Sequence, residues 1–257
     1  MSAVVAAVSG VVGAVVGSFG GVVADRVPRK ESIVRPPSHC TGCGKALGAL
    51  ENIPVVSYIA LRGRCRACGA RIPRRDVAVE VATALLFVAV ALRVGSVWAV
   101  PAYCALAASL VALTAIDLEH LRLPTPIVYG TAALGAPLLV LASAGTHRWA
   151  ALGTALISAA AVLVAFGALF YAVPRGVGFG DVRLASLCGG FLGWIGYREV
   201  LLGIVLAFLF AGLPAIVLLA LRKVNRRTQL PFGPFLAAGT MASVLFGPLL
   251  VRYWLGA

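Results

Sequence analysis

Apolar positions run along this chain in long, nearly unbroken stretches rather than in the alternating patterns of water-soluble helices and strands. A transmembrane helix needs about 20 mostly apolar residues. Eight stretches approach that length, and the sixth of them is short enough that seven spans are expected if it does not cross. They lie near residues 3–24, 77–94, 97–116, 126–144, 149–173, 184–197, 200–221 and 233–254. The pattern predicts an all-α polytopic membrane protein with about eight transmembrane helices.

One long polar segment interrupts this pattern. It divides the chain into a first transmembrane helix at 1–24, a cytoplasmic Cys-rich loop subdomain at 25–76 and a transmembrane core at 77–257. A segment of roughly 50 residues is near the size at which a fold needs a metal or disulfides, because it buries too little apolar surface of its own. We therefore expect residues 25–76 to be a small appended unit.

Composition and charge agree with this prediction. Hydrophobic residues make up 61% of the chain and charged residues 12%, which excludes an ordinary soluble globule. Of the 22 Lys and Arg residues, 18 lie on one side of the eight-span topology, including eleven between Arg26 and Arg75 and four in 222–227. By the positive-inside rule that side is cytoplasmic and the N-terminus is outside. The net charge of +13 is then explained by membrane topology and by contact with anionic lipids, and it does not indicate nucleic-acid binding. We expect a multi-pass protein of the inner membrane.

The loop carries four of the six cysteines in two Cys-x2-Cys pairs, which are Cys40 with Cys43 and Cys65 with Cys68. Two such knuckles supply the four thiolates of a tetrahedral structural zinc site. Gly42, Gly44 and Gly69 suit the tight turns, where the backbone often takes a positive φ. Two disulfides or a redox pair are the alternative, and a cytoplasmic location argues against them.

Acidic residues are rare, and each one near the hydrocarbon is a functional hypothesis. Asp117 ends the third span and Asp181 opens the sixth, so the topology places both at the cytoplasmic boundary, where they can approach each other. Two close carboxylates share a proton, and such a dyad can activate water and protonate a leaving group. Glu80, about one turn inside the second span, is a further candidate contact for a substrate or for the loop.

The stretch "GFGD" places two glycines directly before Asp181. Without side chains, Gly178 and Gly180 would let an extended substrate backbone approach this carboxylate. An aspartate at the start of a helix is more often a cap, however, so this motif alone does not decide between catalysis and capping.

Several stretches in order resemble one family, the type IV prepilin peptidases, which are also called leader peptidases and are G-x-G-D aspartic intramembrane proteases. They are "GSFGGVVADRVPR", "CTGC", "ENIPVVSYIALRGRCRACGARIPRRDVAVE", "AIDLEHLRLP", "GFGDVRLA" and "PFGPFLAAGT". The resemblance implies that Asp117 and Asp181 are catalytic. It also implies that the substrate is a type IV prepilin or pseudopilin, whose short basic leader is cut at the cytoplasmic boundary. Many relatives with such a loop methylate the new N-terminus using S-adenosylmethionine, and Glu51 is among the matching positions.

Three positions depart from the family pattern. Thr125 stands where an acidic residue is usual, Arg183 where lysine is frequent, and Asp25 where an apolar or aromatic residue is usual. Arg183 remains a candidate substrate-binding or loop residue beside the G-x-G-D motif. These departures bear on substrate preference and methylation more than on proteolysis.

Other activities stay open at this stage. A proton-coupled transporter, or an assembly component whose loop docks a partner, would also keep carboxylates at the boundary, but it would need further acids deeper in the spans. A methyltransferase that has lost proteolysis is a further alternative, and the intact pair Asp117 and Asp181 argues against it.

Overall fold

The structure, a computed structural model, describes residues 3–173, 177–221 and 231–255. Within them every regular element is helical, and the only strand-like pairings are two isolated bridges in the Cys-rich loop, His39 with Ala46 and Arg64 with Arg71. The helices are α1 (Ala3–Arg26), η1 (Ala49–Asn52), α2 (Val56–Ala60), α3 (Arg74–Arg93), α4 (Val100–His120), α5 (Thr125–Thr146), α6 (Ala150–Ala172), α7 (Phe179–Ile195), α8 (Tyr197–Ala220) and α9 (Gly233–Leu255). The predicted all-α class is confirmed.

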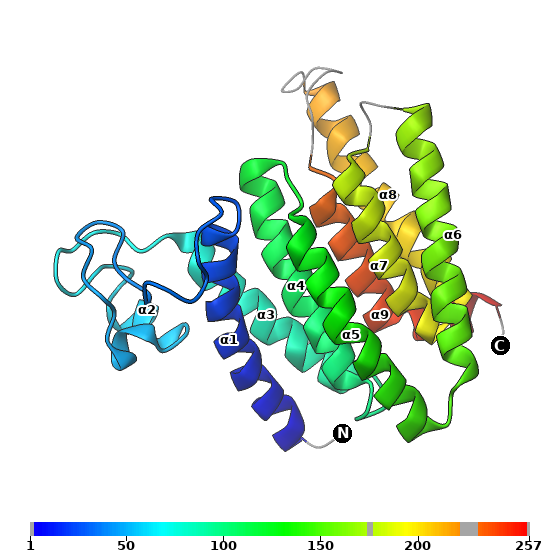
Figure 1. Cartoon of the computed structure of the whole chain (residues 1–257), viewed down its shortest axis with the longest axis horizontal. Coiled ribbons are helices and arrows are strands. Elements are labelled where there is room, and N and C mark those ends of the chain that lie inside the picture. Colours follow the sequence, from blue (N-terminus) through cyan, green and yellow to red (C-terminus); the bar gives the residue numbers. More distant parts are fainter. Residues whose placement is uncertain (1–2, 174–176, 222–230, 256–257) are drawn as a thin grey trace.

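The eight long helices form one bundle with α4 at its centre (Figure 1). The closest neighbours are α1 with α3, α6 with α7, and α8 with α9, while α4 contacts α1, α3, α5 and α9. The most completely buried side chains come from α4, α7 and α9, such as Leu106, Leu184 and Leu236. Tyr103 of α4 joins two of these helices by donating its hydroxyl to the carbonyl of Phe191 at 2.8 Å. Among the candidate membrane spans, α4 is the most deeply buried.

Each predicted span corresponds to one long helix, and among the described residues fewer than eight of these helices meet the criteria of length and apolar composition for a membrane span. Five helices in the described part of the chain are long and apolar enough to cross a membrane, namely α1, α4, α5, α6 and α8. Helix α3 carries five charged residues, Arg74, Arg75, Asp76, Glu80 and Arg93. Helix α7 is short, with 17 residues. Helix α9 contributes the apolar stretch Gly233–Gly247.

The ends of two helices differ from the prediction, and both differences concern the acidic pair. Helix α4 continues to His120, past the expected end at 116, so Asp117 lies inside its last turn. Helix α7 begins at Phe179 rather than 184, so Asp181 lies inside its first turn. Arg175 and the basic segment 222–227, which the charge count placed on the cytoplasmic side, lie outside the described residues.

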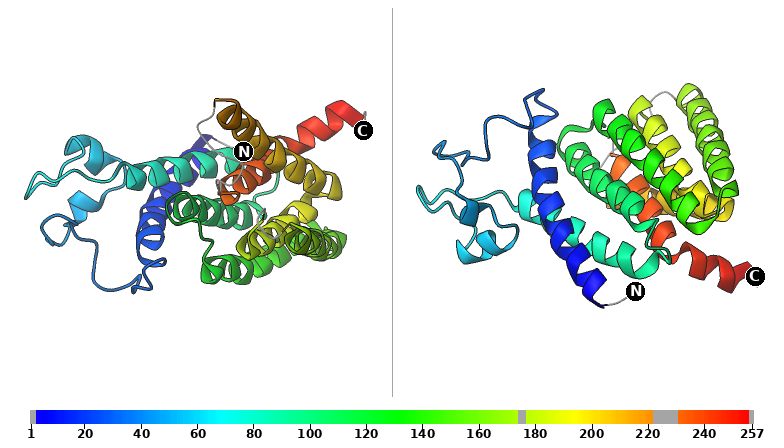
Figure 2. Two further views of the ribbon diagram at one scale, coloured as in Figure 1. Left: turned by 90° about the horizontal axis from the view of Figure 1, so that it is seen from above. Right: turned by 60° about the horizontal axis from the view of Figure 1, so that its bottom comes forward.

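The Cys-rich loop lies beside the bundle, next to α1 and α3 (Figure 1), and both further views show it projecting from this side (Figure 2). Arg26, the last residue of α1, is buried and fixes the start of the loop. Its guanidinium donates to the carbonyls of Ser32, Pro36 and Pro37 at 3.0, 2.7 and 3.4 Å. The loop is therefore tied to the bundle from its first residues onward.

Small residues allow α1 and α3 to approach each other closely. A Cβ atom added to Gly13 would lie 2.8 Å from the Cα of Ala84, and one added to Gly17 would lie 2.7 Å from the Cα of Glu80. The four-residue glycine spacing in α1 thus marks its contact with α3, as in other small-residue helix interfaces in membranes. Gly21, the third glycine at this spacing, has only ordinary contacts with Asp76.

We expect Gly17→Ala to destabilise the protein, because its methyl group would overlap the α3 backbone and overpacking costs about 1–3 kcal/mol. The measurement is thermal unfolding in detergent. Gly153→Ala in α6 is the matched control, since nothing lies within 4 Å of its added Cβ. The control should be neutral or slightly stabilising, as alanine favours a helix over glycine. Equal effects of the two substitutions would contradict the close packing of α1 on α3.

Candidate active site

Asp117 and Asp181 line a single cleft of about 470 Å³ at one end of the bundle. The cleft lies between the end of α4, the connection from α4 to α5, the start of α7 and the segment that follows α1. Asp117 and Asp181 are 5% and 9% exposed. The structure thus brings together two acids that are 64 positions apart in sequence.

Asp117 is held from the far end of the chain. The backbone N–H of Gly233, the first residue of α9, donates to Asp117 Oδ2 at 3.0 Å. The α4 helix ends three residues later, at His120, because Leu121 takes a left-handed conformation with φ of 50° and donates its N–H to the Asp117 carbonyl. One carboxylate oxygen of Asp117 is thereby held by a backbone N–H. The residues that follow the helix turn away from its axis and line the cleft.

Asp181 is held by its own loop. Gly178 is the N-cap of α7, and its backbone N–H donates to Asp181 Oδ2 at 2.8 Å, which satisfies one free donor at the start of the helix. A Cβ atom on Gly178 would lie 3.2 Å from Asp181 Oδ2, and one on Gly180 would lie 3.0 Å from Leu123. These glycines therefore make room for the protein's own groups, and they also line the cleft as predicted for substrate access. Asp181 thus accepts the N–H of the N-cap residue and also lines the cleft, so capping does not exclude a position in the site.

The four loop cysteines form a compact cluster. The sulfur atoms of Cys40, Cys43, Cys65 and Cys68 all lie within 4.8 Å of one another, and those of Cys40 and Cys68 are 3.7 Å apart. A tetrahedral Zn–S₄ centre with bonds of about 2.3 Å has edges of roughly 3.8 Å. All four cysteines are free thiols, so the arrangement has the dimensions of a metal site rather than of two disulfides.

The two knuckles are built alike. Gly44 and Gly69, each directly after the second cysteine of its pair, have φ of 71° and 72°, as expected, whereas the same expectation for Gly42 is wrong. Gly42 instead approaches the other knuckle, where its Cβ would lie 2.9 Å from that of Ala70. Hydrogen bonds from the backbone N–H groups of Gly42 and Cys43 lower the pKa of Cys40 to about 6, which favours the thiolate that a metal requires.

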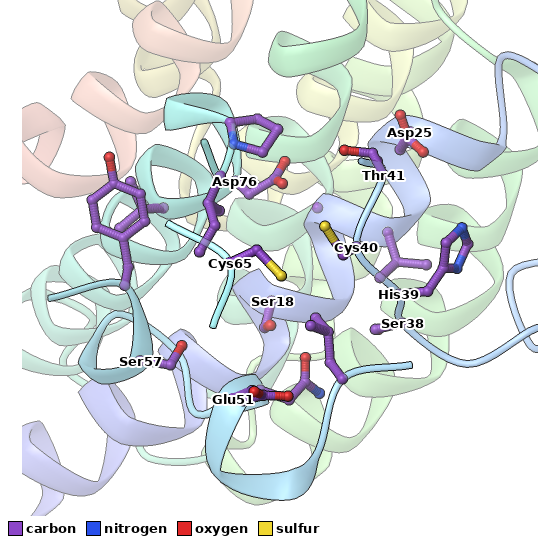
Figure 3. A pocket seen from close by; sticks show the side chains of 18 of the residues that line it. Ser18, Asp25, Ser38, His39, Cys40, Thr41, Glu51, Ser57, Cys65 and Asp76 are labelled. Carbon is purple, nitrogen blue, oxygen red and sulfur yellow. The ribbon is translucent and has the colours of Figure 1, made fainter. Parts of the chain in front are cut away.

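A second cavity, of about 370 Å³, lies between this cluster and the ends of α1 and α3 (Figure 3). Glu51 and Glu80 line it together with Asp25, Glu31 and Asp76, so acids from the loop and from both helices face one space. Glu51 accepts the N–H of Gly48 at 3.0 Å and Glu80 accepts that of Val55 at 2.8 Å. Glu80 therefore lies in this second cavity and not in the cleft of the two aspartates.

A short segment after α1 separates the two spaces. Val27, Pro28 and Lys30 line the aspartate cleft, whereas Arg26, Arg29 and Glu31 line the second cavity. The loop that carries the cysteines thus contributes one wall to the site of the aspartates.

Comparison with known proteins agrees with this geometry. The family model for the bacterial peptidase A24 N-terminal domain matches residues 11–94, and that for the type IV leader peptidase family matches residues 104–220. The chain belongs to the type IV leader peptidase family. It is 32% identical over 273 residues to the prepilin leader peptidase/N-methyltransferase of Pseudomonas aeruginosa, which covers 95% of this chain and 91% of that protein.

Two further relatives carry the same name. The protein of Aeromonas hydrophila is 37% identical across 87% of this chain and 76% of its own length. That of Pseudomonas putida is 33% identical across 92% of this chain and 89% of its own length. No solved structure matches the chain. Family membership therefore extends over nearly the whole sequence.

Two departures from the family pattern contact each other. Arg183 donates to Thr125 Oγ1 at 2.6 Å, and its guanidinium lies 4.3 Å from the centre of the Phe179 ring. Thr125 lines the aspartate cleft, whereas Arg183 lies behind it and links the first turns of α7 and α5. Arg183, a sequence-based candidate for substrate binding, therefore contacts side chains of α5 and α7.

The third departure, Asp25, belongs to an ion-pair cluster around Arg75. Arg75 lies 3.5 Å from Asp25 of α1, 3.2 Å from Asp76 of α3 and 2.6 Å from Glu119 of α4. Glu119 is two residues from Asp117 in the last turn of α4. One arginine at the edge of the second cavity thus links three helix ends, including the one that carries an aspartate of the dyad.

Sequence reasoning missed one residue that contacts Asp117 and one that lines the cleft. Gly233 was part of a recognised motif without an assigned role, yet its N–H holds Asp117, and a Cβ there would lie 2.7 Å from Asp117 Oδ2. Lys30 was counted only as a topological charge, yet it lines the cleft. The motif "PFGP" could have drawn attention to Gly233, whereas no local sequence pattern distinguishes Lys30.

Proposed function

We propose that this chain is a membrane aspartic endopeptidase that removes the leader of type IV prepilins or pseudopilins, with Asp117 and Asp181 as its catalytic pair. The observation that carries the proposal is the shared cleft of two buried carboxylates, each with one oxygen held by a backbone N–H. Membership in the leader peptidase family, and the names of the relatives, supply the substrate class.

The chemistry follows from placing two carboxylates in one poorly solvated site. They do not both ionise there, so one holds a proton while the other stays charged. The charged carboxylate takes a proton from water as the water oxygen bonds to the scissile carbonyl carbon, and the protonated one donates to the carbonyl oxygen. When the C–N bond breaks, the carboxyl that took the water proton donates it to the leaving amine, and the other carboxylate takes a proton from a hydroxyl of the tetrahedral diol. The dyad then again holds one proton, and no covalent intermediate has formed.

The position of the cleft suits a substrate anchored in the bilayer. A prepilin whose apolar helix lies in the membrane would present its leader junction at the end of that helix. The cleft opens at the helix ends of α4 and α7, at the same level of the bundle. We infer from the 18 basic residues assigned to this side that the cleft faces the cytoplasm and that the N-terminus lies outside.

The acids of the core argue against proton-coupled transport. In the described helices from α4 to α9 they lie only near helix ends, namely Asp117 and Glu119 in α4, Asp181 in α7 and Glu199 in α8. A proton relay across the bilayer needs carboxylates at intermediate depth. Asp117, Glu119 and Asp181 instead lie at one boundary, where hydrolysis would take place, and Glu199 lies at the other end of the bundle.

We propose that the four cysteines bind one zinc ion with a structural role. Their spacing fits a Zn–S₄ tetrahedron, and a closed set of four thiolates leaves no position for a reacting water. The zinc would hold the two knuckles together in a loop that lacks a core of its own, and would thereby support the walls of both cavities.

N-methylation is a second candidate activity, favoured by the cavity that Glu51 lines and by the names of the relatives. The carboxylates there would attract the sulfonium cation of S-adenosylmethionine. S-adenosylmethionine would supply the methyl group, and one of these carboxylates would accept the proton that the substrate amine loses. S-adenosylhomocysteine would leave as the product.

Asp117→Asn and Asp181→Asn should each lower prepilin cleavage by about 100-fold or more, the lower range of the contribution of general acid and base groups. The measurement is the gel mobility shift of a co-expressed prepilin at matched levels of membrane-inserted enzyme. Glu199→Gln, an acid at the start of α8, is the control and should keep wild-type cleavage. Wild-type rates in either asparagine variant would exclude the dyad mechanism.

The purified wild-type protein should contain one zinc per chain by elemental mass spectrometry. Cys43→Ser should lose most of this metal and unfold at lower temperature, because an open knuckle no longer clips the loop. Cys104→Ala, which removes a buried thiol of α4 outside the cluster, should retain full zinc content. Metal-free wild-type protein of unchanged stability would refute the zinc proposal.

Glu51→Gln should abolish methylation while leaving cleavage intact. Asp181→Asn should fail to cleave a prepilin, but it should still methylate a pilin that has already been cleaved. Mass spectrometry of the pilin N-terminus reports both reactions in one assay. Loss of both activities in Glu51→Gln, with zinc retained, would show that the two cavities do not work separately.

A further inference from the structure

The Cys-rich loop exposes a row of large aliphatic side chains that neither cavity uses. Leu50 and Ile53 belong to η1 and its C-cap, and Val56 and Ile59 to α2; we call these four residues the η1–α2 patch. Leu50 is 75% exposed and Ile59 is 68% exposed. Exposed apolar side chains that lie close together mark a surface that contacts a membrane or another molecule.

Helix α2 has two distinct faces. Ser57 and Tyr58 line the second cavity, as does Leu61 directly after the helix, so this face points toward the protein. Val56 and Ile59 are three positions apart, share the other face and point away from it. The patch is therefore the outer side of an element whose inner side is already occupied.

The charge around the patch identifies what covers it. Residues 25–76 contain eleven Lys and Arg residues against four acids, and Arg62, Arg64 and Arg66, which directly follow α2, are exposed. Aliphatic side chains next to exposed cations are the composition of elements that lie in a membrane interface and attract anionic lipids. A purely apolar protein partner would account for the aliphatic residues but not for the arginines.

The position of the patch agrees with a membrane contact. The N–H of Val55, the N-cap of α2, donates to Glu80, which lies six residues inside α3 and thus about 9 Å along that helix from its first residue. The start of α2 is therefore fastened beside the second turn of α3 and not beyond its end. The loop accordingly lies at the flank of α1 and α3, where lipid adjoins the bundle, rather than over the ends of the other helices (Figure 1).

We propose that the η1–α2 patch inserts into the headgroup and acyl boundary of the leaflet on the aspartate side, and that the neighbouring arginines bind its anionic headgroups. The contact would hold the cysteine cluster against the bilayer and fix the loop on its outer side, as Arg26 and Arg75 do on its inner side. This inference requires only that the bundle spans a membrane, and it does not depend on the proposed peptidase activity.

The test uses the full chain reconstituted into vesicles that contain phosphatidylglycerol, with bromine atoms near the top of the acyl chains as quenchers. Tryptophan is absent from residues 25–76, so Ile59→Trp adds one reporter there, and its emission is obtained by subtracting that of the wild type. An interfacial helix buries its apolar face by roughly 5–10 Å, so the added emission should shift to the blue and lose about half its intensity or more. Val34→Trp, on an exposed side chain of the same loop outside the patch, should show neither change.

Val56→Trp provides a second reporter on the same face, and retained zinc content shows that each variant is folded. Red-shifted, unquenched emission from both patch positions would overturn the proposal. Quenching or a blue shift that appears only after a prepilin is added would also overturn it, because the patch would then be a docking surface for protein. Unchanged quenching in vesicles of phosphatidylcholine alone would refute the role of the arginines.

Discussion

Hydrocarbon offers no partner to an unpaired backbone N–H or carbonyl, and this constraint shapes the whole molecule. Every long element is a helix, and the irregular segments that carry chemistry lie at the ends of the bundle. Asp117 in the last turn of α4 and Asp181 in the first turn of α7 occupy the places where a charged group can meet water while its helix remains in the membrane. A hydrolytic site in such a protein is therefore a boundary site.

At that boundary, backbone groups take the place that side-chain partners have in many soluble active sites. The two dyad carboxylates accept N–H groups from Gly233 and Gly178, and a side chain at either glycine would press on the carboxylate that it holds. Fixing one oxygen of each acid orients the carboxylate without adding a compensating charge. In the proposed mechanism the second oxygen of each carboxylate would remain for water and substrate.

The Cys-rich loop is joined to this site by a few strong polar contacts. Arg26 fixes the start of the loop, Glu80 holds the N-cap of α2, and Arg75 links α1 and α3 to the end of α4. The segment after α1 then forms a wall of the aspartate cleft. Through these contacts the geometry of the loop and that of the cleft are set together, so the metal proposed for the four cysteines would support both.

The sequence by itself determined the properties that depend on local composition and spacing. Long apolar runs determined the helices, the paired Cys-x2-Cys spacing determined the cysteine cluster, and the rarity of acids directed attention to Asp117 and Asp181. The helix ends near these two acids were less predictable, because capping by Gly178 and the left-handed turn at Leu121 set them more than hydropathy does.

Tertiary structure alone decided which distant groups meet. The bond from Gly233 to Asp117 joins residues 116 positions apart, Glu80 belongs to the cysteine-loop cavity rather than to the dyad, and Arg183 pairs with Thr125. No periodic pattern encodes such pairings, because they depend on how α4, α7 and α9 pack together and on the side from which the loop returns. The local sequence determines the secondary structure that each segment prefers. Because the helices have similar hydropathy, only their packing determines which of their polar ends come together.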